Sequence, residues 1–291
     1  MIGAVDIGGT KIAAGIVDPD GRVLARAQVP TNAEAGYPRA IDATVLMLQN
    51  AERITGQKII GIGIGSTGPV YPMTGEIGDV NFFPDWKGEN PVKDLEAAFQ
   101  VSVAIENDAD AAALGEAGWG AGRNKTHLIY VTVGTGIGVG DPSGPSCYCG
   151  FRGCWESLAT GPAMEGWMAG NIPVDYPHRE NLTAKKICEL AHAGDEWAKR
   201  AVEREARYLG LGLANLVTLY VPDAIVLGGS VMKSADLFLD TVREIIAGSC
   251  RFVPWERTEL ALASLGEEAN LIGAARVWYH RFAPVGGANA G

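Results

Sequence analysis

The sequence predicts an α/β protein built from two similar halves with a cleft between them. The chain has 291 residues, which is more than one domain of ordinary size usually contains. Short apolar stretches typical of buried strands alternate with amphipathic helical stretches. Each half opens with a strand, a glycine-rich turn and a second strand, so a duplicated α/β domain is the economical interpretation. Ligands commonly bind in the cleft between such halves.

The composition limits the classes of function. Hydrophobic residues make up 47% of the chain and charged residues 20%, which allows a sizeable core and excludes global disorder. The formal net charge of −10 argues against a nucleic-acid partner or an anionic membrane surface. No apolar run is long enough to span a bilayer, and no secretory signal opens the chain. We therefore expect a cytoplasmic protein with no membrane or nucleic-acid partner.

The first half is predicted to contain three antiparallel strands followed by alternating helices and strands. The strands are expected at residues 2–5, 12–17, 22–29, 58–65 and 101–105. Helical periodicity predicts helices at 38–54 and 91–99, and an alanine-rich helix begins near residue 108. These elements form a predicted small N-terminal domain over residues 1–117.

The second half repeats the opening of the first and then becomes mainly helical. Strands are expected at 127–133, 137–139, 224–227 and 259–263, and helices at 184–192, 196–220, 235–247 and 270–282. We expect a large C-terminal domain over residues 118–270. Residues 271–291 are expected to contain a C-terminal helix that packs back on the small domain, followed by a flexible glycine- and alanine-rich tail.

One polar junction stands out between a strand and a helix. Asn107 and Asp108 follow an apolar strand and precede the alanine-rich helix, so either is placed to act as the N-cap. The positive end of the helix dipole and its free N–H groups favour an ionised carboxylate there. Such a carboxylate can accept a proton from a hydroxyl group, although an ordinary helix cap is the simpler alternative.

Three glycine turns follow predicted strands, at residues 6–11, 134–138 and 228–230. Glycine lets the backbone approach an anion and point its N–H groups at it, so together the turns suggest a bound nucleotide. Residues 63–68 match the dinucleotide pattern G-x-G-x-x-G, but Pro69 and Pro72 follow where a helix is required, so we reject that interpretation. The chain contains no P-loop motif.

Five segments together resemble the ROK family, which comprises repressors, open reading frames and sugar kinases. They stand in the family's order: 6–11 (DIGGTK), 106–116 (ENDADAAALGE), 133–138 (VGTGIG), 147–156 (CYCGFRGCWE) and 226–230 (VLGGS). The resemblance covers nearly the whole chain, and the cysteine segment is its most specific part. It implies the two-domain actin/hexokinase-like fold, also described as ribonuclease H-like, with an interdomain cleft. It also implies phosphoryl transfer from Mg²⁺-ATP to a sugar hydroxyl in a glucokinase-like enzyme that forms a homodimer.

The resemblance assigns roles to individual residues. Asp108 matches the family's general base. The sugar contacts would come from Gly68, Asn81, Asn107, Asp108 and Glu156. A first phosphate loop would comprise Asp6, Gly8, Gly9, Thr10 and Lys11, with Asp6 near the metal ion. A second phosphate loop would contain Gly134, Thr135 and Gly136, and the adenosine turn would contain Gly228 and Gly229. The family has one residue fewer between Asn81 and the following proline, so a plain turn asparagine is the alternative at that position.

The cysteine segment suggests a structural zinc site. Cys147, Cys149 and Cys154 supply three thiolates for a tetrahedral Zn²⁺, with free thiols as the alternative. The family takes its fourth ligand from a Glu-x-x-His element, but no histidine lies between residues 128 and 177. Either the element is naturally deleted between Gly140 and Asp141, or it belongs to the protein and is missing from this sequence. The second explanation is the one we favour, because the cysteines and Asp108 persist.

Two other functions compete with an ATP-dependent kinase acting on a hexose hydroxyl, with the 6-OH of glucose as the first choice. A non-catalytic sugar sensor of the repressor branch would carry an N-terminal DNA-binding head, for which the phosphate loop at Asp6 leaves no room. An actin-like ATPase would have no use for a polar set such as Asn107, Asp108 and Glu156, which suits a polyol.

Overall fold

The chain folds into two compact units in the computed structural model, which describes residues 1–133, 145 and 152–283. Unit 1 comprises Met1–Lys125 and the chain from Ala263 onward, and unit 2 comprises Thr126–Leu262. The boundaries expected from the sequence, 117 and 270, both lie inside unit 1. The described part of the chain contains no helix that is both long and apolar enough to cross a membrane.

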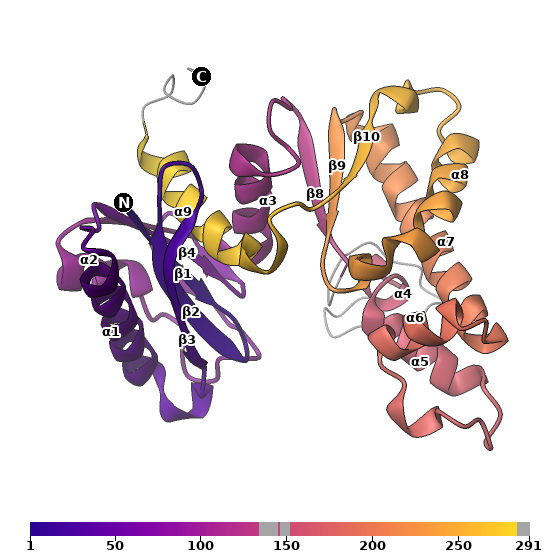
Figure 1. The fold of residues 1–291 in the computed structure, drawn as a ribbon, viewed down its shortest axis with the longest axis horizontal. Coiled ribbons are helices and arrows are strands. Elements are labelled where there is room, and N and C mark those ends of the chain that lie inside the picture. Colours follow the sequence, from indigo (N-terminus) through magenta and orange to yellow (C-terminus); the bar gives the residue numbers. More distant parts are fainter. Residues whose placement is uncertain (134–144, 146–151, 284–291) are drawn as a thin grey trace. The chain divides into compact units, whose positions relative to one another are not determined.

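Unit 1 is built from both ends of the described chain (Figure 1). Its elements are β1 (Ile2–Ile7), β2 (Lys11–Val17), β3 (Val23–Pro30), η1 (Ala33–Ala35), α1 (Tyr37–Thr55), β4 (Gly61–Ser66), β5 (Val70–Tyr71), β6 (Glu76–Ile77), α2 (Pro91–Phe99), β7 (Ser102–Asn107), α3 (Asp108–Trp119), η5 (Gly266–Glu268) and α9 (Ala269–Phe282). β4 leads into β5 and not into a helix, which confirms the rejection of a dinucleotide motif at residues 63–68.

The sheet of unit 1 has five strands in the order β3-β2-β1-β4-β7. The hairpin strands β1, β2 and β3 pair antiparallel, whereas β1, β4 and β7 run parallel to one another. β4 alternates glycine with isoleucine before a final serine, and all six residues are buried, as expected for a strand that is covered on both faces. The parallel half of the sheet therefore lies inside the unit.

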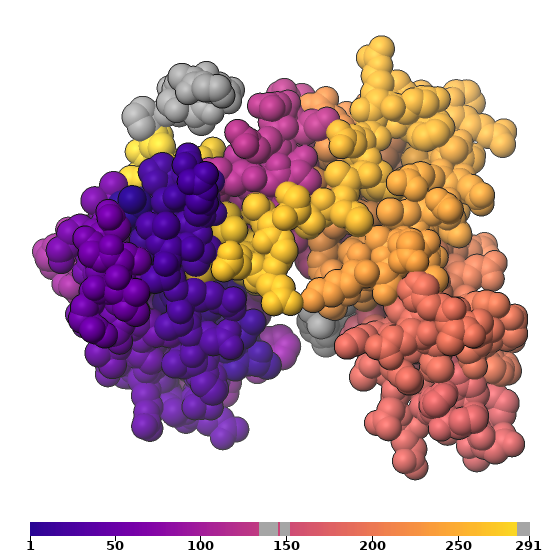
Figure 2. All heavy atoms as spheres, viewed as in Figure 1, coloured from indigo at the N-terminus to yellow at the C-terminus, as the bar shows by residue number. Residues whose placement is uncertain are grey.

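Helices cover both faces of this sheet. Val5 and Ile7 of β1 belong to the core that includes residues of α1, whereas Ile2 and Ala4 belong to a second core with residues of α9. Because side chains alternate along a strand, α1 and α9 lie on opposite faces. Figure 2 shows the yellow C-terminal helix packed against the violet N-terminal part of the chain.

α9 approaches the sheet closely because glycines face it. A Cβ atom at Gly63 would lie 1.8 Å from the carbonyl oxygen of Ala274, and one at Gly61 would lie 2.1 Å from Nε1 of Trp278. α9 also packs on α3, where a Cβ atom at Gly115 would come within 2.9 Å of Cα of Gly273. The sheet, α9 and α3 therefore form one closely packed body.

Unit 2 is mainly helical, with a three-stranded parallel sheet in the order β10-β9-β8. Its elements are β8 (Leu128–Thr132), α4 (Trp155–Leu158), α5 (Gly161–Asn171), η2 (Arg179–Asn181), α6 (Ala184–His192), α7 (Glu196–Tyr220), β9 (Ala224–Gly228), η3 (Val231–Leu237), α8 (Leu239–Ser249), η4 (Trp255–Arg257) and β10 (Glu259–Leu262). The strand expected at 137–139 lies outside the described residues.

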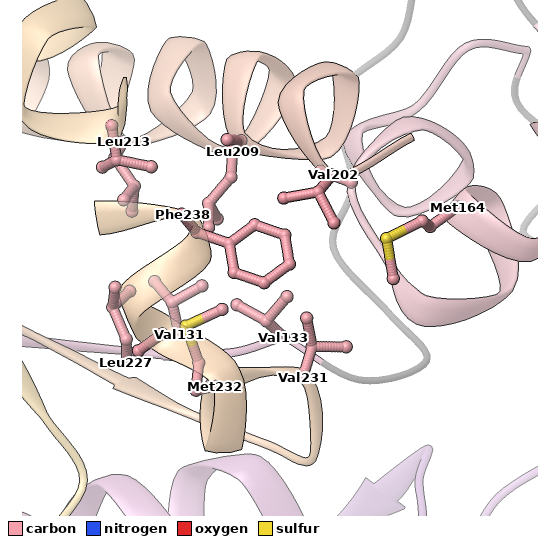
Figure 3. Packing of buried hydrophobic residues seen from close by; sticks show 14 of the residues in the cluster. Val131, Val133, Met164, Val202, Leu209, Leu213, Leu227, Val231, Met232 and Phe238 are labelled. Carbon is pink, nitrogen blue, oxygen red and sulfur yellow. The ribbon is translucent and has the colours of Figure 1, made fainter. Parts of the chain in front are cut away.

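Phe238 lies in the middle of the core of unit 2 (Figure 3). Its side chain is fully buried, among Leu209 of α7, Val133 after β8 and Val231 of η3. The ring therefore joins the long helix to the segments that follow β8 and β9. Those two segments carry the glycine turns singled out in the sequence.

Candidate active site

The carboxyl ends of three parallel strands form one edge of the sheet in unit 1. Asp6 of β1 stands in register with Gly65 of β4, which stands in register with Glu106 of β7. The segments that follow these strands therefore lie next to one another. They are the glycine turn after β1, residues 67–68 after β4, and the start of α3 after β7. Open α/β sheets characteristically bind ligands at such an edge.

Asn107 and Asp108 share the start of α3. Asn107 is the N-cap, and its Oδ1 accepts a hydrogen bond of 2.9 Å from the N–H of Ala109. Asp108 is the first helical residue, and its Oδ1 accepts from the same N–H at 2.8 Å. Its Oδ2 accepts from the hydroxyl of Thr67 at 3.3 Å. The sequence leaves open which of the two residues is the N-cap. In the structure it is Asn107, and Asp108 is held in place beside it.

The surroundings of Asp108 make its carboxylate a stronger base than an exposed aspartate. Burial raises the pKa of Asp108, while the hydrogen bonds from Ala109 and Thr67 lower it, and the nearby charge of Asp110 raises it. The net direction is upward because burial is the largest of these effects. A raised pKa brings a general base closer to the pH at which enzymes operate.

Asp6 is a second carboxyl group at the same edge. Its side chain is buried, and Oδ2 accepts a hydrogen bond of 3.5 Å from the amide of Asn270. The pKa of Asp6 is raised to about 6, chiefly by burial. The hydrogen bond from Asn270 opposes this rise, the charge of Asp108 adds to it, and the charge of Lys11 opposes it. Above pH 6 the ionised form of Asp6 predominates, so the carboxylates of Asp6 and Asp108 lie near each other as two anionic groups. Hard divalent cations such as Mg²⁺ prefer carboxylate oxygens, so Asp6 fits such an ion.

The glycine turn after β1 is fastened at both of its ends. The N–H of Gly8 donates to the carbonyl of Lys11 at 3.0 Å, and the hydroxyl of Thr31 donates to the carbonyl of Gly8 at 2.6 Å. The N–H of Thr31 also donates to the carbonyl of Thr10 at 3.0 Å. Thr10 and Lys11 are themselves exposed. The turn therefore has a fixed backbone with a hydroxyl and an ammonium group on its outer side.

Gly68 packs against the capping amide of Asn107. A Cβ atom at Gly68 would lie only 2.8 Å from Nδ2 of Asn107, which real Cβ contacts essentially never show. A larger residue at this position would displace the amide that caps α3. The structure thus brings Gly68 together with Asn107, two residues of the predicted sugar-binding set.

Phe82 is a residue at this site that the sequence analysis does not single out. Its side chain is 60% exposed, yet its ring lies so close to Gly9 that a Cβ atom there would be 3.1 Å from Cγ of Phe82. The preceding residue, Asn81, is exposed. The segment is anchored by Phe83 and Trp86, whose stacked rings have centroids 4.7 Å apart. The sequence feature that could have drawn attention to this segment is the extra residue between Asn81 and the following proline, relative to the family.

Three of the predicted site residues, Gly228, Gly229 and Glu156, belong to unit 2. Gly228 ends β9, and its carbonyl accepts from the N–H of Val133 at 2.9 Å. Gly229 has a φ of +94°, and a Cβ atom there would lie 2.5 Å from the carbonyl oxygen of Val133. Only glycine fits both demands at Gly229. Glu156 is the second residue of α4 and is buried.

Several predicted residues lie outside the described part of the chain. They are Gly134, Thr135, Gly136, Cys147 and Cys149. Cys154 is described and fully buried, at the N-cap position of α4. Among residues 1–133, 145 and 152–283, no group of three or more His, Cys, Asp or Glu side chains is arranged to hold a metal ion.

The fold and this edge together define a class of protein. A glycine turn, a buried aspartate and a second, hydrogen-bonded aspartate meet at the ends of parallel strands, an arrangement suited to the transfer of a phosphoryl group. The ROK family model matches residues 2–140 and 141–281. The chain belongs to the ROK family.

Comparison with known relatives agrees along nearly the full length. A glucokinase of Streptomyces coelicolor is 33% identical over 312 residues, with 93% of this chain and 95% of the relative covered. The ROK hexokinase of Thermus thermophilus is 35% identical, with a TM-score of 0.79 and coverage of 96% and 98%. A ROK glucokinase of Streptomyces griseus, solved with glucose and AMPPNP, is 30% identical, with a TM-score of 0.79 and coverage of 96% and 99%. The actin/hexokinase-like fold predicted from the sequence is confirmed.

The family match is interrupted between Gly140 and Asp141. That is the position at which the sequence analysis expects the Glu-x-x-His element to be missing. The alignment with the Streptomyces coelicolor glucokinase is also longer, at 312 residues, than the 291 residues of this chain. The relative therefore has residues without a counterpart here.

Proposed function

We propose that the protein is an ATP-dependent hexose kinase, with the 6-OH of glucose or of a related hexose as the acceptor. One observation carries the proposal: the edge of the unit 1 sheet joins Asp108, held by Ala109 and Thr67, to the glycine turn and to Asp6. A base and a phosphate-binding turn at one edge are what transfer to a hydroxyl requires. The kinase relatives support the same activity.

In the proposed reaction, the sugar hydroxyl oxygen attacks the γ-phosphorus of ATP, and the bond from that phosphorus to the β,γ-bridging oxygen breaks, so that ADP leaves. Asp108 accepts the hydroxyl proton as the new O–P bond forms. The sugar would be held by Gly68, Asn81, Asn107 and Glu156. The nucleotide phosphates would be held by the Gly8–Lys11 turn and by Gly134, Thr135 and Gly136, with the adenosine on Gly228 and Gly229. Mg²⁺ near Asp6 would neutralise charge on the transferred group.

A panel of sugars tests the proposed activity. With Mg²⁺-ATP, we expect at least one hexose or N-acetylhexosamine to raise ADP release well above the rate with ATP alone. The panel should include glucose, mannose, fructose, N-acetylglucosamine and N-acetylmannosamine, because these differ by only one or two polar contacts. Sugar binding without any increase in ADP release would favour a sensor. ADP release that no sugar changes would favour an actin-like ATPase.

We also propose that Cys147, Cys149 and Cys154 bind a structural Zn²⁺, with a histidine from the missing Glu-x-x-His element as the fourth ligand. The support is the family match, which breaks at residue 140 just before the cysteines. The burial of Cys154 is compatible with a closed structural site. The ion would order the segment that carries Glu156.

Metal analysis and intact mass, measured on the same purified protein, test this zinc proposal. We expect about one zinc per chain and a mass above 30.6 kDa. Removal of zinc by a chelator should raise the KM for sugar, because Glu156 loses its support. A mass of 30.6 kDa with no zinc would show that the deletion is natural and would leave the cysteines as thiols.

Two further expectations rest on the sequence alone. The three clustered cysteines, which suit a metal site in a reducing compartment, support a cytoplasmic location. The family resemblance supports a homodimer.

A further inference from the structure

Glu116 is a buried charged residue that the proposed reaction does not use. It lies near the end of α3, and its side chain is fully buried. Burial of a carboxylate is costly unless hydrogen bonds compensate for the lost water. The partners of Glu116 therefore indicate why the residue is there.

Both carboxylate oxygens of Glu116 accept hydrogen bonds from the backbone. Oε2 accepts from the N–H of Ala121 at 2.7 Å. Oε1 accepts from the N–H of Ser264 at 2.9 Å and of Leu265 at 3.0 Å. The hydroxyl of Ser264 adds a bond of 3.3 Å to Oε2. One side chain thus links two segments that are more than a hundred residues apart in the sequence.

These two segments are where the chain leaves and re-enters unit 1. Unit 1 ends at Lys125 and resumes at Ala263, so the first link begins just after α3 and the second ends just before α9. The backbone carbonyl of Glu116 also accepts from the N–H of Gly120 at 3.1 Å and of Gly122 at 2.9 Å. A Cβ atom at Gly120 would lie 2.0 Å from Oε2, so glycine is required for this approach.

The same helix carries the proposed base at its other end. Asp108 and Glu116 are eight residues apart in α3, which corresponds to about 12 Å along the helix axis. α3 is packed firmly on α9 through Gly115 and Gly273. A displacement of either link is therefore transmitted to a rigid element that begins at the active-site edge.

We infer that Glu116 is a positioning residue that fastens both links to the end of α3 and so holds the helix that carries Asp108. Its hydrogen bonds to Ala121, Ser264 and Leu265 tie the end of α3 to the segment before α9. This role rests on the proposed kinase function.

Glu116→Gln is the sharpest test of the anchor. Glutamine has the same size but only one acceptor oxygen, so its NH₂ group must face an N–H donor on one of the two links. We expect amide hydrogen exchange at residues 121 and 264–265 to accelerate about tenfold or more at the released link. We expect kcat to fall about tenfold, while the KM for sugar changes less than twofold, because the proposed sugar contacts Gly68, Asn81 and Glu156 do not belong to α3.

Glu205→Gln is the matched control. Glu205 of α7 is also fully buried, and neither of its carboxyl oxygens has a hydrogen-bond partner among the described residues. Burial raises the pKa of Glu205 to about 9, so it is already neutral at pH 7. The same chemical change there should leave exchange at the links and kcat within twofold of the wild-type values.

The outcomes separate the anchoring role of Glu116 from the kinase proposal. If the wild-type protein phosphorylates no sugar, the proposed function fails, and the exchange data still decide whether Glu116 anchors the links. If the wild type is active and Glu116→Gln behaves like Glu205→Gln in both measurements, the inference is wrong. Should Glu116→Gln not fold, Ser264→Ala removes only the 3.3 Å bond and should accelerate exchange at residues 264–265 two- to threefold; no acceleration would overturn the anchor.

Discussion

Replacement of Asp108 by Asn is expected to lower kcat for sugar phosphorylation by about 10²- to 10⁴-fold, the usual contribution of a general base. Asparagine cannot accept the hydroxyl proton, but its one oxygen can still accept the hydrogen bond from Ala109, and its NH₂ group can donate to the hydroxyl oxygen of Thr67. The start of α3 and the capping by Asn107 should therefore persist. The KM and the directly measured Kd for sugar should change less than threefold. Steady-state kinetics and calorimetric titration with sugar measure the two quantities.

Asp110→Asn is the control for this experiment. Asp110 lies in the first turn of the same helix and is exposed. The Asp110→Asn substitution removes the same charge as Asp108→Asn. The described effect of Asp110 on Asp108 is to raise the pKa of the Asp108 carboxyl group. Its kcat should stay within threefold of wild type. Equal activity in both variants would return Asp108 to the role of a structural residue at the helix start.

Replacement of Phe238 by Ala is expected to destabilise unit 2 by about 3–5 kcal/mol, as large-to-small changes of buried aromatic residues do. The side chain is fully buried among residues of α7 and of the segments after β8 and β9, so its removal leaves a cavity. Because chains with more than one compact unit commonly depart from two-state unfolding, the transition of each unit should be followed on its own. Urea unfolding monitored by hydrogen exchange of β9 and of β4 does this.

Phe252→Ala provides the same chemical change without the cavity. Phe252 belongs to unit 2 and is completely exposed. Its free energy of unfolding should lie within about 0.5 kcal/mol of wild type. If Phe238→Ala were equally mild, the core around Phe238 could not be the structure that supports the segment after β9.

The long periodic elements could be predicted from the sequence because their signals are local. The helices expected at 184–192 and 196–220 are α6 and α7, with the same bounds. Hydrophobic periodicity and the capping residues Thr183 and Asp195 suffice for them, since each cap accepts a hydrogen bond from the helix it begins. The helix expected at 235–247 instead begins at Leu239, because the preceding turns form η3 with a non-helical residue at Ser234.

Short elements were missed because tertiary contacts determine them. The two-residue strands β5 and β6 have no periodic pattern, and α5 is rich in glycine and methionine. Helix propensity alone disfavours α5, yet Thr160 caps it and Met164 and Met168 bury its inner face. Burial against other elements outweighs propensity in such segments.

At the site, sequence reasoning located residues but could not supply their partners. The strand-to-helix junction predicted Asn107 and Asp108 as neighbours of a helix start, yet nothing local indicated Thr67 as the second support of Asp108. That contact depends on the register between β4 and β7. Phe82 was missed for the same reason, because its proximity to Gly9 joins segments more than seventy residues apart.

The construction of unit 1 from both ends of the chain has a consequence for its biosynthesis. Ile2, Ala4 and Val17 are synthesised before unit 2, but the residues that cover them, Leu271, Ala274 and Ala275, are synthesised after it. Domains generally fold as units while the chain is being made. Unit 2 is continuous in the sequence, so all its residues are synthesised before α9. One face of the earlier-made sheet of unit 1 stays uncovered until α9 is synthesised. The nascent chain must therefore protect an apolar surface while unit 2 is synthesised.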